Sequence, residues 1–145
     1  MEIKTYDKAF LGEDEFRSLI KRADDLFVPP LSEVVDIRAY AEKLYTRASF
    51  VVAEENGEVK GFIAFYKNRE ANQLYITLIC VERDCQGRGV GGKMLQCLEA
   101  LRADGFGSIA LEVTKSNEGG IRFYKRHGFG EQEDRGKKFL MLKTI

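Results

Sequence analysis

The chain has no excess of charge of either sign, because 23 lysines and arginines balance 23 aspartates and glutamates. Without a net positive field it offers no general attraction for nucleic acid or anionic lipid. No apolar run approaches the roughly 20 residues that a membrane-spanning helix needs. The start of the sequence, residues 1–4, is charged and lacks the apolar segment of a signal peptide. These absences predict a cytoplasmic protein that binds neither nucleic acid nor membranes.

Cysteine and histidine are also scarce. Three cysteines, an odd number without a C-x-x-C pair, argue against a disulfide framework. Cys80 and Cys97 are expected to be small buried hydrophobic residues. His127 is the only histidine, and one histidine does not make a metal site, so no metal is expected.

At 145 residues the chain is expected to form one domain that buries roughly two-thirds of its extended surface. A short strand is predicted at 2–6. Apolar residues at helical spacing predict a helix over 13–27, which Pro29-Pro30 ends. Ser32 is placed to cap a second helix that runs to about Tyr45.

Strand patterns dominate the middle of the chain. The strands 49–55 and 58–66 are joined by Asn56-Gly57, a strong hairpin signal because both residues tolerate a positive φ. A polar connection, 67–73, leads to a strand at 74–81 that is apolar enough to be buried on both faces. The remaining elements are predicted as a helix to about 101, a strand at 108–113, a helix at 117–127 and closing strands at 129–133 and 138–143.

The most informative stretch follows the apolar strand. Gly87, Gly89, Gly91 and Gly92 leave the backbone bare, so that its N–H groups can approach a ligand. Apolar residues at helical spacing then begin a helix, whose N-terminus carries unpaired N–H groups and about half a unit of positive charge. The stretch is therefore predicted to hold a phosphorylated cofactor.

Two known phosphate-binding motifs can be compared with this stretch. Gly87, Gly89 and Gly92 fit the dinucleotide fingerprint G-x-G-x-x-G, with Glu112 about 20 residues later. This reading ranks second, because residues 82–86 separate the strand from the glycines and too few residues follow Glu112 for a second half-sheet. A nucleoside-triphosphate loop is excluded, because no Gly-Lys-Ser/Thr follows the glycines.

A third pattern matches better. Gln86-Gly87-Arg88-Gly89-Val90-Gly91 resembles the Arg/Gln-x-x-Gly-x-Gly/Ala signature of the GNAT superfamily of acyl-CoA-dependent N-acetyltransferases. Leu111-Glu112-Val113 and the segment 117–129 are similar to the family's L-E-V…N-x-x-A-I-x-x-Y-x-x-x-G-F block, so the resemblance covers about 74–130. The sequence departs from the family at Arg83, where proline is frequent, and at Gly119-Gly120, which replaces small helix formers.

The resemblance implies an α/β fold in a single domain, 1–145. Its central sheet is expected to be mixed, mostly antiparallel and about seven-stranded, with helices on both faces and the order β-α-α-β-β-β-α-β-α-β-β. It also implies acetyl-CoA as co-substrate, with the pyrophosphate on the glycine loop and the pantetheine arm along the end of the apolar strand. The implied contact residues are Ile79, Cys80, Val81, Gln86, Gly87, Arg88, Gly89, Val90, Gly91, Gly92 and Asn117.

Tyr124 and Glu112 are the implied catalytic residues. In the family, a tyrosine at the position of Tyr124 protonates the leaving thiolate. The transfer is not far uphill, since a phenol and a thiol have pKa values of about 10 and about 8.5. Glu112 is a candidate base for the substrate ammonium, and it is equally a candidate for orienting that amine. Asn117 is also placed as a plain helix cap.

The sequence thus predicts transfer of an acetyl group from acetyl-CoA to a primary amine, in a ternary complex without a covalent intermediate. A small-molecule amine is favoured over a protein acceptor, and the protein is expected to be a monomer or homodimer. The acceptor is expected to enter beside the two N-terminal helices and their connection 28–31, with loops 67–73 and 133–138 at the rim. A non-catalytic acyl-CoA-binding module and an NAD(P)-binding protein remain as alternatives.

Overall fold

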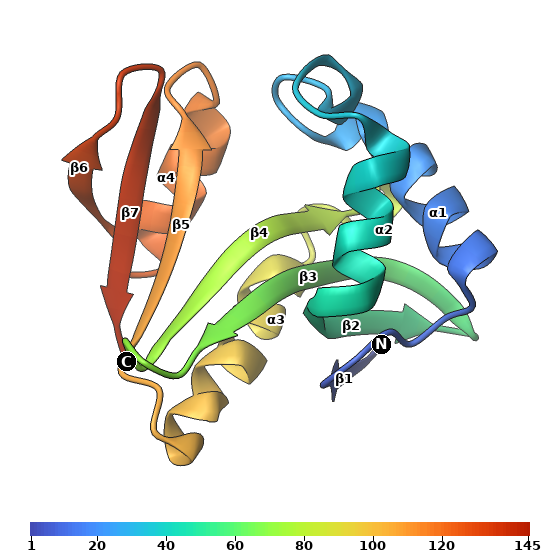
Figure 1. Cartoon of the computed structure of the whole chain (residues 1–145), viewed down its shortest axis with the longest axis horizontal. Helices are drawn as coiled ribbons and strands as arrows, with labels where there is room; N and C mark the ends of the chain where they lie inside the picture. The colour runs from blue at the N-terminus through green and yellow to red at the C-terminus, as the bar shows by residue number, and fades with distance from the viewer.

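Seven strands form one sheet in the order β1-β2-β3-β4-β5-β7-β6, in which only the pair β4–β5 is parallel (Figure 1). This computed structural model describes all 145 residues. The strands are β1 Glu2–Tyr6, β2 Ser49–Glu55, β3 Glu58–Asn68, β4 Gln73–Val81, β5 Ser108–Thr114, β6 Gly130–Asp134 and β7 Lys138–Thr144. The mixed, mostly antiparallel seven-stranded sheet predicted from the sequence is confirmed.

Four α-helices lie on the two faces of the sheet, in the predicted order along the chain (Figure 1). They are α1 Glu13–Arg22, α2 Ile37–Arg47, α3 Val90–Glu99 and α4 Glu118–Arg126. Short 3-10 helices are η1 Asp24–Leu26, η2 Leu31–Glu33, η3 Arg83–Cys85 and η4 Ala100–Asp104. None of the helices combines the length and apolar character that crossing a bilayer requires.

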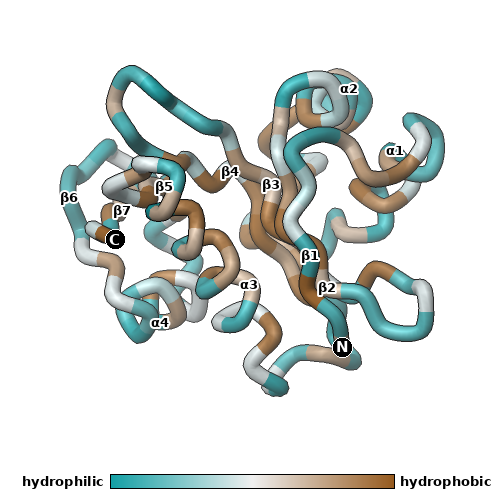
Figure 2. The backbone as a smooth tube through the Cα atoms, turned by 90° about the horizontal axis from the view of Figure 1, so that it is seen from below, coloured by the Kyte–Doolittle hydropathy of each residue, from teal (hydrophilic) through white to brown (hydrophobic).

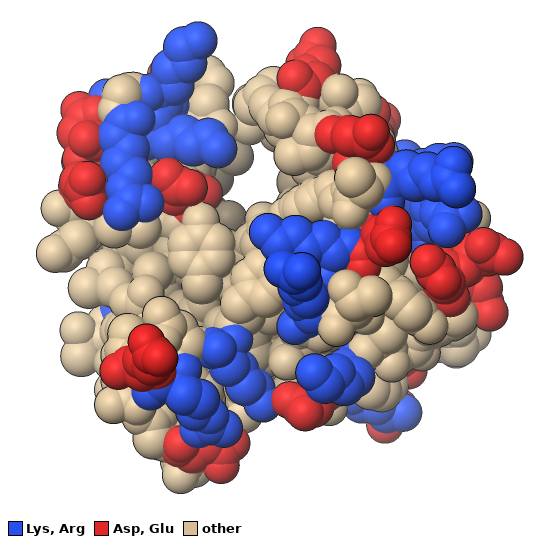
Figure 3. Space-filling model, viewed as in Figure 1, with Lys and Arg blue, Asp and Glu red and all other residues tan.

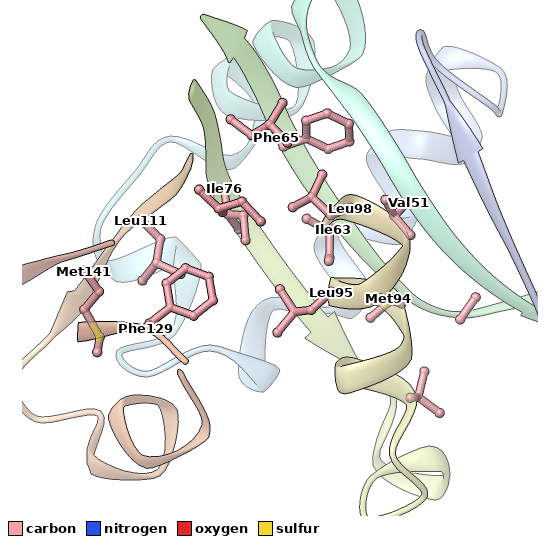
Figure 4. Close-up of a cluster of buried hydrophobic side chains, with 14 of the residues drawn as sticks. Val51, Ile63, Phe65, Ile76, Met94, Leu95, Leu98, Leu111, Phe129 and Met141 are labelled. Carbon is pink, nitrogen blue, oxygen red and sulfur yellow. The ribbon is translucent and has the colours of Figure 1, made fainter. Parts of the chain in front are cut away.

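The sheet separates two apolar cores, and its central strands carry most of the hydrophobic residues (Figure 2). Alternation along β3 sends Phe62 into the core under α1 and α2, and sends Ile63 into the core under α3. Figure 4 shows the second core, in which Leu95 and Leu98 of α3 project towards Ile63. Packing on both faces fixes the sheet between the helix layers.

A bulge in β4 opens the centre of the sheet. Ala64 pairs with Leu78 and Phe65 pairs with Ile76, so Thr77 is the extra residue. Such an insertion changes the face to which later side chains point. Accordingly Ile76 packs in the α3 core, whereas Leu78 packs in the α1–α2 core.

Beyond the bulge, β4 separates from β5. The two strands pair only from Gln73↔Ser108 to Ile76↔Leu111, and they then diverge (Figure 1). The prediction that this strand is buried on both faces is therefore wrong, because buried and partly exposed residues alternate along β4. Ile79 and Val81, on its diverging half, contact the edge of the core under α3 and also line a cleft, so they are only partly buried.

Two details of the N-terminal helices also differ from the predictions. The first helix ends at Arg22 rather than continuing to 27, and a 3-10 turn follows it. Ser32 does not cap the second helix, because its backbone N–H and its hydroxyl donate to the Asp24 carboxylate at 2.6 and 2.8 Å. Asp36 is the cap, with its side chain accepting from the Ala39 N–H at 3.2 Å.

Candidate active site

Two adjoining cavities occupy the space where β4 and β5 diverge. The larger, of about 750 Å³, is lined by the glycine loop, the end of β4 and α4. The smaller, of about 150 Å³, lies between the α1–α2 connection and β5. Val28, Ile79, Asn117 and Tyr124 line both cavities. Figure 3 shows the molecule hollowed here, between the β5–β7 side and the α1–α2 side.

The backbone between β4 and α3 is shaped to present N–H groups. Gly87 and Gly89 have φ values of 79° and 76°, in a backbone conformation that residues with a side chain rarely adopt. Gly89 is also the N-cap of α3, and no side chain caps this helix end. The first N–H groups of α3 therefore face the larger cavity without side-chain acceptors, as an anion site requires.

Gly91 and Gly92 have a different role, because they let α4 approach α3. A Cβ atom on Gly91 would lie 2.9 Å from Cζ of Phe123, and one on Gly92 would lie 2.7 Å from Cε1 of His127. The Phe123 and His127 rings pack together with their centroids 4.6 Å apart. These two glycines thus set the distance between the glycine loop and the helix that carries Tyr124.

The free edge of β4 is the second feature of the larger cavity. Past Ile76 this edge has no partner strand, so backbone N–H and C=O groups between Thr77 and Val81 are open to the cleft. The Gln86 amide already donates to the Val81 carbonyl at 3.0 Å. One wall of the larger cavity is therefore formed by four of the residues for which a cofactor contact is expected, Ile79, Cys80, Val81 and Gln86.

Arg88 is the one residue between Gln86 and Gly92 that does not line the larger cavity. Its guanidinium binds the Glu55 carboxylate at 3.1 Å, and it contacts Cys85 Sγ at 3.5 Å. Cys85 itself is fully buried, and burial raises the pKa of its thiol. The structure therefore does not place Arg88 with the other predicted contact residues on the cavity wall, and its side chain instead ties the loop to the β2–β3 hairpin.

Tyr124 lies on α4 where the two cavities meet. Its ring packs edge-on against Phe123 and Phe129, with centroids 5.4 and 5.8 Å away. Its hydroxyl makes no hydrogen bond within the chain and is not sealed from the cavities. Burial raises the pKa of Tyr124, so the phenol keeps its proton at neutral pH. The arrangement provides a fixed, protonated and unengaged donor.

Glu112 faces the smaller cavity with Tyr124, but its carboxylate is already engaged. Oε1 accepts from the Tyr75 hydroxyl at 3.3 Å, and Oε2 accepts from Arg135 Nη1 at 3.4 Å. Burial, followed by the charge of Glu112, raises the pKa of Tyr75 to about 12, so Tyr75 remains a donor. Neither partner is predictable from the sequence. Arg135 is 23 residues from Glu112, and no local pattern connects them.

Asn117 caps α4, because its Oδ1 accepts from the Gly120 N–H at 2.9 Å. The two glycines of the first turn are therefore not equivalent. A Cβ on Gly120 would lie 2.5 Å from the Asn117 amide nitrogen, whereas a Cβ on Gly119 meets nothing nearer than 3.9 Å. The helix cap expected at Asn117 is confirmed.

This difference predicts opposite effects of two alanine substitutions. Gly119→Ala should raise the free energy of unfolding by about 0.5–1 kcal/mol, because alanine favours a helix and restricts the unfolded chain. Gly120→Ala should lower it by about 1 kcal/mol, because the new methyl displaces the capping side chain. Urea denaturation of the two variants measures both changes. Equal effects of the same sign would show that the Asn117 cap does not distinguish the two positions.

The prediction that the 67–73 loop lies at the rim of the cleft is wrong. The 67–73 connection lies at the opposite end of β4 from the cleft, where Lys67 binds Asp7 at 2.7 Å and the Arg69 guanidinium lies over Phe106 (Figure 1). The turn between β6 and β7 does reach the cleft, since its Arg135 contacts Glu112. The smaller cavity is therefore bordered by this turn and by the α1–α2 connection.

Solved structures share this fold over nearly the whole chain. The PaiA N-acetyltransferase of Thermoplasma acidophilum, solved in complex with coenzyme A, is 18% identical, with a TM-score of 0.75 and 100% of both chains covered. The ribosomal-protein-S18-alanine N-acetyltransferase of Escherichia coli is 18% identical, with a TM-score of 0.71, over 99% of this chain and 94% of that one. A Pyrococcus horikoshii protein is 26% identical, with a TM-score of 0.77 over 99% of both chains.

Sequence relatives cover the chain less completely. An uncharacterized N-acetyltransferase of Methanocaldococcus jannaschii is 37% identical over 102 residues, which are 66% of this chain and 45% of the relative. The 5-NmdU N-acetyltransferase of a Pseudomonas phage, PaMx11, is 30% identical over 89 residues, 61% of this chain and 62% of the relative. The chain therefore spans less than two thirds of the length of either relative.

The family comparison covers more of the chain than these relatives do. The sequence model of the acetyltransferase (GNAT) family matches residues 16–129, from α1 to the end of the α4 segment. The match includes the glycine loop, Glu112, Asn117 and Tyr124, which the structure brings around one pair of cavities. The chain therefore belongs to the acetyltransferase (GNAT) family.

Proposed function

We propose that the protein transfers an acetyl group from acetyl-CoA to a primary amine of a small molecule, by direct attack in a ternary complex. One observation carries the proposal. A continuous path leads from the bare N-terminus of α3, along the open edge of β4, to the unengaged Tyr124 hydroxyl. The cavity of about 750 Å³ along this path is within the range typical of cofactor sites.

The residues along this path fit the successive parts of coenzyme A. Backbone N–H groups of the 87–92 segment would hold the pyrophosphate, since the positive-φ glycines and the uncapped helix end aim them into the cavity. Backbone groups from Ile79 to Val81, other than the Val81 carbonyl that Gln86 already binds, would pair with the amides of the pantetheine arm, as an added strand does. Asn117 lines the same cavity and would contact the arm near Tyr124.

Bound acetyl-CoA supplies the acetyl thioester. A backbone N–H of the Ile79–Val81 segment would donate to the thioester carbonyl, an interaction whose loss typically costs about 3–4 kcal/mol. The amine nitrogen forms the new bond to the carbonyl carbon as the carbon–sulfur bond breaks. Tyr124 gives its proton to the departing sulfur, and the amine proton leaves to water.

Glu112 is assigned to orienting the acceptor amine, because both of its oxygens are already held by hydrogen bonds. Glu112→Gln should raise the KM for the amine about tenfold and change kcat less than about threefold, as expected for a residue that binds rather than reacts. Steady-state rates at pH 7.5 and pH 9 measure this. A kcat defect that shrinks as pH rises would instead identify Glu112 as the base, since more amine is then already neutral.

The overall proposal is tested by ligand-dependent stabilisation and thiol release. A ligand at 100 times its dissociation constant adds about 2.7 kcal/mol of stability. Melting temperatures should therefore rise by about 5–10 °C with acetyl-CoA or coenzyme A and should not rise with NAD or NADP. Amine-dependent thiol release should follow. If acetyl-CoA stabilises the protein but no small amine or amine-bearing peptide causes thiol release, the protein is an acyl-CoA-binding module and not a transferase.

A further inference from the structure

Two opposite charges stand side by side at the mouth of the smaller cavity. Arg135 Nη1 and Glu112 Oε2 are 3.4 Å apart, at the turn between β6 and β7 and on β5 respectively. Glu112 lines the cavity, whereas Arg135 lies at its rim with 41% of its side chain exposed. A molecule that reaches the cleft therefore meets a carboxylate and a guanidinium together.

The Arg135 guanidinium has capacity for a further anion. It has five N–H donors, and the two hydrogen bonds that it makes go to Glu112 and Glu133. Lys137 and Lys138, in the same turn and the strand that follows, have no ion-pair partner. Figure 3 shows blue lysines and arginines and red aspartates and glutamates side by side on the β6–β7 side of the hollow. The donors that remain free on Arg135 can therefore bind a negatively charged group of a ligand.

The opposite wall of the cavity is apolar. Leu26, Phe27 and Val28 line it from the α1–α2 connection. Val28 is 51% exposed, one of only three large hydrophobic residues with such exposure, and it faces both cavities. Exposed apolar surface within a ligand cavity is favourable only when a ligand covers it. The acceptor should therefore bring an apolar group to Val28.

We propose that the acceptor is an α-amino acid with an apolar side chain, an inference that rests on the transferase function proposed above. Its ammonium group binds Glu112, its carboxylate binds Arg135, and its side chain covers Phe27 and Val28. The ammonium and carboxylate of the ligand and the side chains of Arg135 and Glu112 then form a ring in which positive and negative groups alternate. A polyamine has no anionic group for Arg135, and an amino sugar has no apolar side chain for the opposite wall.

Matched pairs of acceptors test this directly. L-phenylalanine and phenethylamine differ only in the carboxylate, as do L-leucine and 3-methylbutylamine. In thiol-release assays, kcat/KM should be at least about tenfold higher for each amino acid than for its decarboxylated partner. Arg135→Gln should raise the KM for the amino acids at least about tenfold more than it raises the KM for the simple amines, which lose only the contact between Arg135 and Glu112. Arg135→Lys should restore part of the loss.

Lys137→Gln is the control, because it removes the same charge from the same turn and should alter neither class of acceptor by more than about twofold. Retained stabilisation by acetyl-CoA confirms that each variant is folded. Equal effects of Arg135→Gln on amino acids and simple amines would overturn the inference, as would a wild-type preference for the decarboxylated partners. If neither amino acids nor simple amines cause thiol release from acetyl-CoA, although acetyl-CoA still stabilises the protein, the transferase function itself would be overturned.

Discussion

Replacing Tyr124 by phenylalanine should lower kcat at least about tenfold and leave the dissociation constant of acetyl-CoA within about twofold. The substitution removes only the hydroxyl, which makes no hydrogen bond within the chain, so the fold loses nothing. The ring contacts with Phe123 and Phe129 are kept. The rate falls because the departing thiolate then takes its proton from water. Thiol-release kinetics and acetyl-CoA titration measure the two quantities separately.

Tyr6→Phe provides the matched control. Its hydroxyl donates to Glu54 at 3.1 Å on the far edge of the sheet, away from both cavities. This substitution should leave kcat within about twofold, because it alters no group that contacts a substrate. If Tyr124→Phe behaves like Tyr6→Phe, then Tyr124 is not the proton donor.

Gly91→Val should impair both stability and activity. The valine Cβ would lie within 2.9 Å of the Phe123 ring, so α4 or its side chains must shift. Overpacking of this kind typically costs about 1–3 kcal/mol, or several degrees of melting temperature. Because Phe123 precedes Tyr124, the same shift moves the proton donor away from the glycine loop. We expect the KM for acetyl-CoA to rise and kcat to fall, each by about tenfold.

A compensating substitution isolates the cause. Phe123→Leu removes the ring atoms that the new side chain meets, so the double variant should regain much of the lost stability and activity. Gly130→Val serves as the control, because a Cβ there meets nothing within 4 Å. Strictly additive losses in the double variant would show that contact with Phe123 is not the reason for the effect.

The elements that rest on local chemistry were predictable from the sequence. Asn56 and Gly57 adopt φ values of 54° and 78°, as the hairpin signal requires. The glycines between β4 and α3 identified the loop because their backbone conformation and exposure are local properties. Tyr124 and Asn117 came from the family resemblance, and the structure places both beside the loop.

What could not be predicted depends on tertiary pairing. The bulge at Thr77 is set by the register of β4 against β3, and no residue type in β4 predicts it. The apolar run there looked like a strand buried on both faces, because the cleft that exposes Ile79 and Val81 exists only once β5 diverges. Arg135 reaches Glu112 only because β7 pairs with β5 and brings the turn to the cleft.

The placement of the α2 cap illustrates competition between equivalent local signals. Ser32 and Asp36 are both suitable helix caps. The serine is instead held by Asp24 across the α1–α2 connection, and α2 begins one turn later, after Asp36. That connection forms the apolar wall of the smaller cavity, so the choice of cap affects the shape of the candidate site.

A crystal structure with bound coenzyme A tests the central claim most directly. We predict the pyrophosphate against the backbone N–H groups of the 87–92 segment, and the thiol between β4 and β5 within hydrogen-bonding reach of the Tyr124 hydroxyl. A structure in which those N–H groups bond only to protein, or in which the thiol lies outside the β4–β5 opening, would contradict the account.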